Sequence, residues 1–229
     1  MIHSDFITGV VTNMEISGAF ISSLLAAQGL DCHVTQDREL TSSVTSSWGV
    51  DWNEDMIARD LMQNFFDANR EQLDDVSVSD SGRDITVSAP TVFNLDRLFY
   101  LGSEKGEDDV GHYDEGFKVA AVCLLRNHAV VPVCVSGDRA VAQAIADTPV
   151  ASTDMRPLTY RFYEVEPGKA GTRLLLPRCK PKLATAIRNG MTHFFTLQSL
   201  CWESSSGETQ PILRFTNRAL PRATCSIAT

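Results

Sequence analysis

Patterns that would place the chain in or across a membrane are missing from this sequence. No stretch approaches the roughly 18 consecutive apolar residues of a membrane-spanning helix, since the longest apolar run extends only from Val119 to Leu125. The start, "MIHSDFITG", lacks the basic segment and apolar block of a secretory signal. These absences predict a cytoplasmic protein with no membrane partner.

Common metal and nucleophile motifs are missing as well. The six cysteines are scattered, with no C-x-x-C pair and no histidine pair at zinc spacing. We therefore expect reduced, mostly buried thiols. There is no G-x-S-x-G elbow, no Walker lysine loop and no catalytic Cys/His signature. His112 and Glu115 share a polar loop, but their spacing fits no helical ligand pair, so a solvated loop is the simpler interpretation.

Positive charge is scarce over most of the chain. The net charge is −9, yet residues 169 to 229 hold nine Lys/Arg against two Glu, a balance of +7 that leaves −16 for residues 1 to 168. The acidic bulk argues against general nucleic-acid binding. The basic C-terminal part leaves room for a local contact with nucleic acid or an acidic protein, which nothing else in the sequence supports.

The residues that are present predict a globular α+β protein. Its 229 residues, 43% of them apolar, suffice for a substantial core. Periodicity predicts helices at 16–30, 54–72, 94–102, 117–127 and 181–200, a hairpin at 75–88, and strands at 129–136, 158–165 and 172–177. The Ser/Thr-rich stretch 39–49 and the polar stretch 103–116 are expected to be loops. This order predicts a two-layer sandwich, with a mixed, mostly antiparallel sheet and helices on one face.

The segment "DLMQNFFDAN" (60–69) carries an unusual polar stripe. At helical spacing Asp60, Gln63, Asn64 and Asp67 share one side, while bulky apolar residues occupy the other. One interpretation is a solvated face. The other is chemical, because a carboxylate can orient a water while a carboxamide oxygen one turn away ligates a hard cation such as Mg²⁺.

A glycine-containing loop precedes the predicted helix at 117–127. In "GHYDEG" (111–116) the glycines would let an anion approach the backbone, and the helix behind them would offer unpaired N–H groups. Lys105 and Lys118 flank this loop and could meet a phosphate, or could simply be solvated.

Taken together and in this order, these segments resemble the ATP-binding domain of the GHKL superfamily, over about residues 50 to 200. "DLMQNFFDA" looks like the N-box of that family, "LGSEK" and "VGHYDEGFKVAA" like its lid and second glycine box, and "GT" at 171–172 like its threonine strand. The Asp-Ala ending and the absence of a phosphoacceptor-histidine helix favour the gyrase, Hsp-ninety-type chaperone and MutL branch. The resemblance implies a Bergerat-type ATP-binding fold.

The resemblance also implies roles for single residues. Asp60 would be the general base that activates water, and Asn64 would hold Mg²⁺ against the phosphates of ATP. The remaining nucleotide-binding positions would be Asp67, Lys105 in the lid, Gly111, Glu115, Gly116, Phe117, Lys118, and Thr172 on the adenine side. The implied function is ATP binding with slow Mg-dependent hydrolysis, used as a conformational and dimerisation switch.

Three positions depart from the family pattern. Members of the family usually have Glu where this chain has Asp60, and glycine where it has Asp114. The strand that should end in Asp-x-Gly ends instead at Ala89. Asp80 does precede a glycine, but it lies in the predicted hairpin turn. These departures keep a second hypothesis open, a degenerate domain that serves as a non-hydrolysing binding or interaction module.

The predicted organisation is one nucleotide-binding domain with flanking parts. Residues 1–50 would be an N-terminal segment, partly helical, that packs on the main domain at 51–200. Residues 201–229 would be a C-terminal strand or tail, or the start of a further element. A homodimer or a second subunit would fit the predicted switch.

Overall fold

The computed structural model describes residues 16–69, 71–100 and 115–191, and they form an α+β fold. The α-helices are α1 (Gly18–Ala27), α2 (Glu54–Ala68), α3 (Glu115–Cys123) and α4 (Pro181–Gly190). The strands are β1 (His33–Thr45), β2 (Ser77–Ser81), β3 (Asp84–Ala89), β4 (Val133–Ile145) and β5 (Pro157–Leu176). Short helical turns are η2 (Leu73–Asp75), η3 (Leu95–Leu98) and the π-helix η4 (Leu124–His128).

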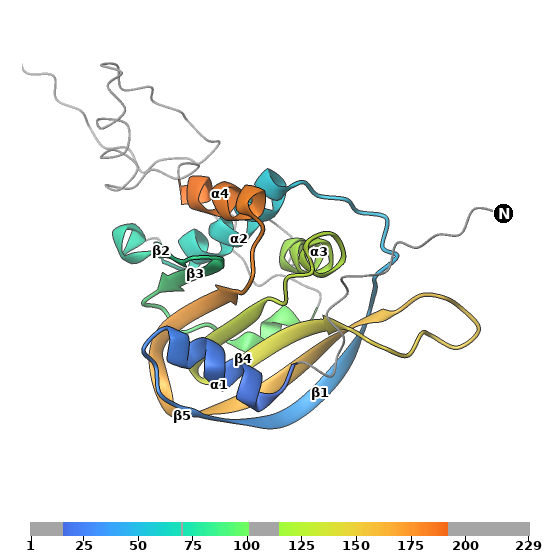
Figure 1. Ribbon diagram of the computed structural model, residues 1–229, viewed down its shortest axis with the longest axis horizontal. Coiled ribbons are helices and arrows are strands. Elements are labelled where there is room, and N and C mark those ends of the chain that lie inside the picture. The colour runs from blue at the N-terminus through green and yellow to red at the C-terminus, as the bar shows by residue number, and fades with distance from the viewer. Residues whose placement is uncertain (1–15, 70, 101–114, 192–229) are drawn as a thin grey trace, which may run out of the picture.

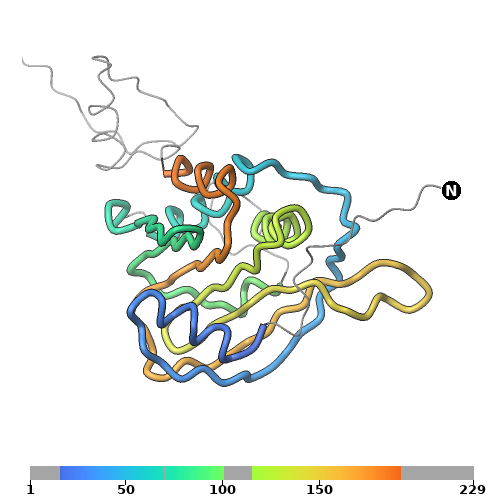
Figure 2. Tube along the Cα trace, in the orientation of Figure 1, coloured from blue at the N-terminus to red at the C-terminus, as the bar shows by residue number. Residues whose placement is uncertain are grey.

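The five strands form one antiparallel sheet in which β4 folds back on itself. The N–H of Gln143 donates to the carbonyl of Pro132, and Gly137 has a positive φ of 61° at the turn between them. The first part of β4 pairs with the end of β5, and its second part with the beginning of β5. The chain of β5 therefore passes around the tip of β4, as can be followed in Figure 2. β1 borders the first half of β5, β3 borders its second half, and β2 pairs with β3 at the edge of the sheet.

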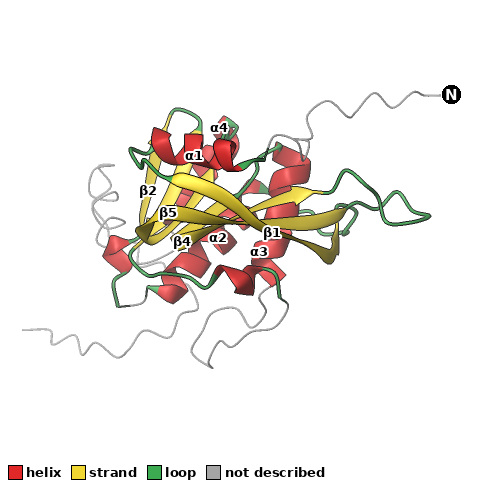
Figure 3. Ribbon diagram, turned by 90° about the horizontal axis from the view of Figure 1, so that it is seen from below, coloured by secondary structure: helices red, strands yellow, loops and turns green. Residues whose placement is uncertain are grey.

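Helices cover both faces of this sheet unequally. Figure 1 shows α2, α3 and α4 above β1, β4 and β5, and in Figure 3 the strands lie in front of α2 and α3. Arg161 and Tyr163 both donate to the carbonyl of Ile16, just before α1. Tyr160, on the opposite face of β5, contacts Phe99 after η3. The predicted α+β fold class is confirmed. In addition, the short helix α1 packs on the second face of the sheet.

Local sequence explains where α1 and α2 begin. The side chain of Ser17 accepts from the N–H of Phe20 at the start of α1, and that of Asn53 accepts from the N–H of Met56 at the start of α2. Both are N-caps, which satisfy donors that the first helical turn leaves unpaired. α1 ends two residues before Gly29, whose φ of +71° suits glycine. The predicted end of the first helix near Gly29 is confirmed.

Several predicted elements are confirmed and others need correction. The hairpin predicted at 75–88 forms as β2 and β3, and the strand predicted at 158–165 lies within β5. The strand predicted at 129–136 begins only at Val133 in β4, and the one predicted at 172–177 ends at Leu176 in β5. The helix predicted at 54–72 ends at Ala68, and the one predicted at 94–102 is the short turn η3. The loop predicted at 39–49 is wrong, because most of it belongs to β1. Thr41 and Thr45 pair with β5, and the hydroxyl of Ser42 donates to the carbonyl of Leu158 in β5. Threonine also suits a half-exposed strand.

Arg126 ties the π-helix η4 to the segment that joins β1 to α2. Its guanidinium donates to the carbonyls of Ser46, Trp48 and Val50 at 3.2, 3.0 and 2.6 Å. The guanidinium fork suits several acceptors at once, and charge-assisted hydrogen bonds are stronger than neutral ones. This contact fixes the position from which α2 starts.

We expect Arg126→Ala to lower the free energy of unfolding by about 1.5 kcal/mol, because three carbonyls lose a charged donor at a partly exposed site. Urea denaturation measures this change. Arg59→Ala is the matched control, since Arg59 is exposed on α2 and its side chain makes no hydrogen bond or ion pair with the described residues. The control should cost less than about 0.5 kcal/mol. Equal losses in both variants would contradict the role of Arg126.

Candidate functional site

The polar stripe of α2 lies at a helix junction rather than in open solvent. Asp60, Gln63, Asn64 and Asp67 are all half-buried, whereas Met56 and Arg59 of the same helix are exposed. The carboxylate of Asp60 faces the first turn of α3: a Cβ built on Gly116 would lie 2.1 Å from Oδ1 of Asp60. The fold thus joins two motifs that are more than 50 residues apart in sequence. The stripe is therefore not a fully solvated helix face.

The contact with Gly116 gives a physical reason for an aspartate at position 60. A Cβ at residue 116 would also lie 2.7 Å from Cγ of Asp60, so the carboxylate already reaches the backbone of α3. A longer glutamate side chain would have to move away from this backbone. The shorter acid and the glycine are therefore matched to each other.

The amide of Asn64 is oriented by Asp60. Its Nδ2 donates to the backbone carbonyl of Asp60 at 2.9 Å and makes a longer contact of 3.4 Å with Oδ2. These bonds use the nitrogen, and within the described ranges Oδ1 accepts none. Mg²⁺ prefers oxygen ligands and is usually bound by one or two carboxylates together with substrate phosphates. The Asn64 amide oxygen and the Asp60 carboxylate are both oxygen donors, so their chemistry is compatible with that ion.

Three groups in the first turn of α3 have different surroundings. Glu115 is exposed, Phe117 is buried, and Lys118 is buried with 1% of its surface exposed. The Nζ of Lys118 donates to the carbonyl of Tyr100 at 2.6 Å. Lys118 therefore points inward, toward the end of the segment that follows η3. Lys105, Gly111, His112 and Asp114 lie outside the described residues.

Thr172 lies in a buried hydroxyl network at the end of β3. Its Oγ1 donates to the carbonyl of Thr91 at 2.8 Å, accepts from the N–H of Phe93 at 3.1 Å, and lies 2.7 Å from Oγ of Ser136. One donor and two acceptor positions are all that a hydroxyl has. The chain itself thus uses the full bonding capacity of Thr172.

Ala89 is the direct cross-strand partner of Thr172. Position 89, where the resemblance would place an aspartate, therefore lies beside Thr172 but offers only a methyl group. The network also includes Ser136, which sequence reasoning did not select. It lies at the end of the strand predicted for 129–136, and its hydroxyl accepts from the N–H of Phe93 at 2.7 Å.

No protein-family model and no curated protein matches this chain. Among the residues that the structure describes, no group of three or more His, Cys, Asp and Glu side chains could hold a metal ion by itself. In the same ranges, no helix is long and apolar enough to cross a membrane.

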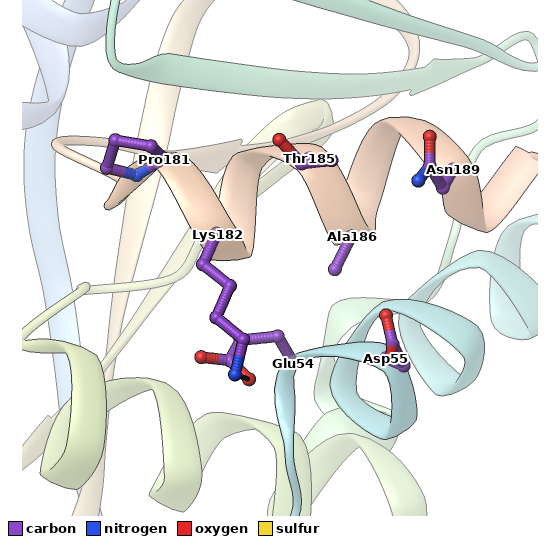
Figure 4. Close-up of a pocket in the computed structure, with 7 residues that line it drawn as sticks. All are labelled: Glu54, Asp55, Pro181, Lys182, Thr185, Ala186 and Asn189. Atoms are coloured by element: carbon purple, nitrogen blue, oxygen red, sulfur yellow. Dashed lines mark ion pairs between the residues drawn. The ribbon is translucent and has the colours of Figure 1, made fainter.

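A groove of about 360 Å³ lies elsewhere, between the start of α2 and α4. In Figure 4, Lys182 of α4 extends toward Glu54 of α2, and their charged groups are 2.9 Å apart. The hydrogen bond from Lys182 lowers the pKa of Glu54. The groove has no wall from α3 or from the stripe of α2. It is not the site predicted from the sequence.

His128, at the end of η4, gives stability a defined pH dependence. Burial lowers its pKa from 6.5, although Glu54 acts in the opposite direction. The imidazole of His128 therefore binds a proton more readily in the unfolded chain than in the folded chain. As the pH falls below 6.5, protonation favours the unfolded state, and the stability that neutral His128 contributes above that pH is lost. We expect the loss of stability between about pH 7.5 and 5.5 to be smaller in His128→Gln. Urea denaturation at both pH values measures it, and equal losses would contradict this assignment.

Proposed function

We propose that this chain is a nucleotide-binding domain of GHKL type, which binds Mg-ATP between α2 and the start of α3 and hydrolyses it slowly. The observation that carries the proposal is the contact between the Asp60 carboxylate and Gly116, which unites the two motifs on which the resemblance rests. The confirmed α+β fold and the pairing of position 89 with Thr172 support it.

The proposed roles follow from the position of each group. Oδ1 of Asn64 would ligate Mg²⁺, an ion that supplies charge neutralisation beside the phosphates. Asp60 would orient a water and accept its proton while the water oxygen bonds to the γ-phosphorus and the bond to the ADP oxygen breaks. The absence of a side chain at Gly116 leaves room for the Asp60 carboxylate against the first turn of α3. A phosphate would meet the first N–H groups of α3 beside that carboxylate. The products would be ADP and phosphate.

Slow turnover would suit a switch, because the useful output is the population of a conformation that the nucleotide favours. The partner of that conformation is predicted to be a second copy of the chain or a second subunit. Contact with nucleic acid and the cytoplasmic location also stay predictions.

Calorimetric titration of the protein with Mg-ATP tests the proposal directly. We expect saturable binding that requires Mg²⁺ and is weakened about ten-fold or more in Asn64→Ala, because the variant loses the amide oxygen. Gln63→Ala, a neighbouring amide of the same helix, is the control and should bind normally. Absence of Mg-dependent ATP binding by the unmodified chain would refute the proposal.

A second function is favoured by one specific pair of observations. Ala89 offers no carboxylate, and the Thr172 hydroxyl is fully bonded within the chain. A degenerate domain that acts as a non-hydrolysing binding or interaction module would have this appearance. In that case Asn64→Ala would leave cellular function intact, and a loss of function would count against the module.

A further inference from the structure

Two buried polar side chains on the sheet have no hydrogen-bond partner among the residues that the structure describes. Gln143 in β4 and Tyr160 in β5 are direct cross-strand partners, and both side chains are 0% exposed. Within the described ranges, neither Oε1 nor Nε2 of Gln143 nor the hydroxyl of Tyr160 makes a hydrogen bond. Buried polar atoms without partners destabilise a fold and are rare. Three such atoms on one cross-strand pair therefore indicate a binding site for a polar ligand.

The pair lies on the same side of the sheet as η3. Cross-strand partners share a face, and the ring of Phe99 packs edge-on against Tyr160 with centroids 5.4 Å apart. Phe99 in turn contacts Tyr100, whose carbonyl accepts from Lys118 in the first turn of α3. A continuous series of contacts thus connects Gln143 and Tyr160 with the helix start at Gly116.

The chemistry of the pair matches a nucleobase. A carboxamide presents a donor and an acceptor side by side, and the edges of adenine present the complementary pair. The aromatic rings next to it supply a surface on which a planar base can stack. Burial raises the pKa of Tyr160, so its hydroxyl stays protonated and can act as a donor.

We propose that Gln143 and Tyr160 bind the base of the nucleotide, and that the Phe99 ring, which packs against Tyr160, moves aside to admit it. This inference rests on the proposed function and identifies the residues that replace the aspartate missing at position 89. Ala89 has no polar side chain and Thr172 has no unused bonding capacity, whereas Gln143 and Tyr160 have three polar atoms to offer. A base would enter by displacing the half-buried ring of Phe99.

Two near-isosteric variants, Tyr160→Phe and Gln143→Leu, separate recognition from folding. Each removes orphaned polar atoms, so the free variants should be at least as stable as the unmodified chain in thermal denaturation. Calorimetry should show Mg-ATP affinity reduced about ten-fold or more in each, because hydrogen bonds to the base are lost. Binding of Mg-tripolyphosphate, which has no base, should be unchanged.

The matched control is Thr159→Val, a buried hydroxyl on the opposite face of β5. Thr159 is satisfied by the carbonyl of Ala144 at 3.3 Å, so this variant should lose stability and keep its affinity for Mg-ATP. Unchanged Mg-ATP affinity in Tyr160→Phe and Gln143→Leu would overturn the inference while the proposed function stands. A clear loss of stability in both free variants would also overturn it, since the polar atoms would then serve the fold. If the unmodified chain bound neither Mg-ATP nor tripolyphosphate, both proposals would fail.

Discussion

Gly171→Ala is expected to lower the free energy of unfolding by about 4 kcal/mol, because two penalties coincide at this residue. Its φ of +69° is unfavourable for alanine, and a Cβ there would lie 2.2 Å from the carbonyl oxygen of Ala89. The obstacle is backbone, so no side-chain rotation can relieve it. The segment after Ala89 is itself held, since the N–H of Thr91 donates to Asn69 and that of Phe93 to Ser136.

Gly82→Ala separates the two penalties. Gly82 has a similar φ of +73° in the turn between β2 and β3, but a Cβ there would meet nothing within 4 Å. We expect this control to lose only about 1 kcal/mol, the cost of the backbone conformation alone. Urea denaturation of both variants gives the comparison. If Gly171→Ala lost no more stability than Gly82→Ala, the close approach to Ala89 would be refuted.

If the proposed function holds, Asp60→Asn is expected to reduce the rate of ATP hydrolysis by a factor on the order of 10² to 10⁴, the range associated with a positioned general base. Asparagine preserves the shape that fits against Gly116 but cannot accept the proton of the attacking water. The affinity for Mg-ATP should change little, because Asn64 keeps its backbone bond to residue 60. Phosphate release under saturating Mg-ATP measures the rate, and calorimetry measures the affinity.

Asp55→Asn is the matched control for this prediction. Asp55 is an exposed acid on the same helix, at the groove between α2 and α4 and away from α3. Its replacement should leave both rate and affinity unchanged. If Asp60→Asn hydrolysed ATP at the unmodified rate, Asp60 would not be the base. If the unmodified chain bound ATP without hydrolysing it, the non-hydrolysing module would be favoured.

Local patterns in the sequence predict those parts of the fold that local physics determines. The spacing of apolar residues indicates α2, and the alternation around Gly82 indicates the β2–β3 hairpin. Helical spacing also identifies each residue of the stripe on α2. It does not identify the contact with Gly116, because periodicity gives the face of a helix and says nothing about which distant segment packs there.

The features that sequence reasoning missed depend on long-range pairing. β1 contains Ser and Thr residues typical of a loop and is a strand only because β5 pairs with it more than 100 residues later. The second half of β4, from Arg139, follows a turn at Gly137 and Asp138, and the strand predicted at 129–136 did not make use of this Gly-Asp hairpin signal. Gln143 and Tyr160 have unremarkable neighbours in sequence, and only the sheet register makes them partners.

The way in which β5 encloses the folded-back β4 also bears on the order of assembly. Residues 133–176 are contiguous and pair largely with one another, so their contacts close loops of modest length. β1 must instead find a partner that the chain reaches much later. The centre of the sheet can thus form as a cooperative unit onto which β1 docks afterwards. Backbone amides of β4 and the enclosing halves of β5 would then exchange with deuterium last, and those of β1 earlier.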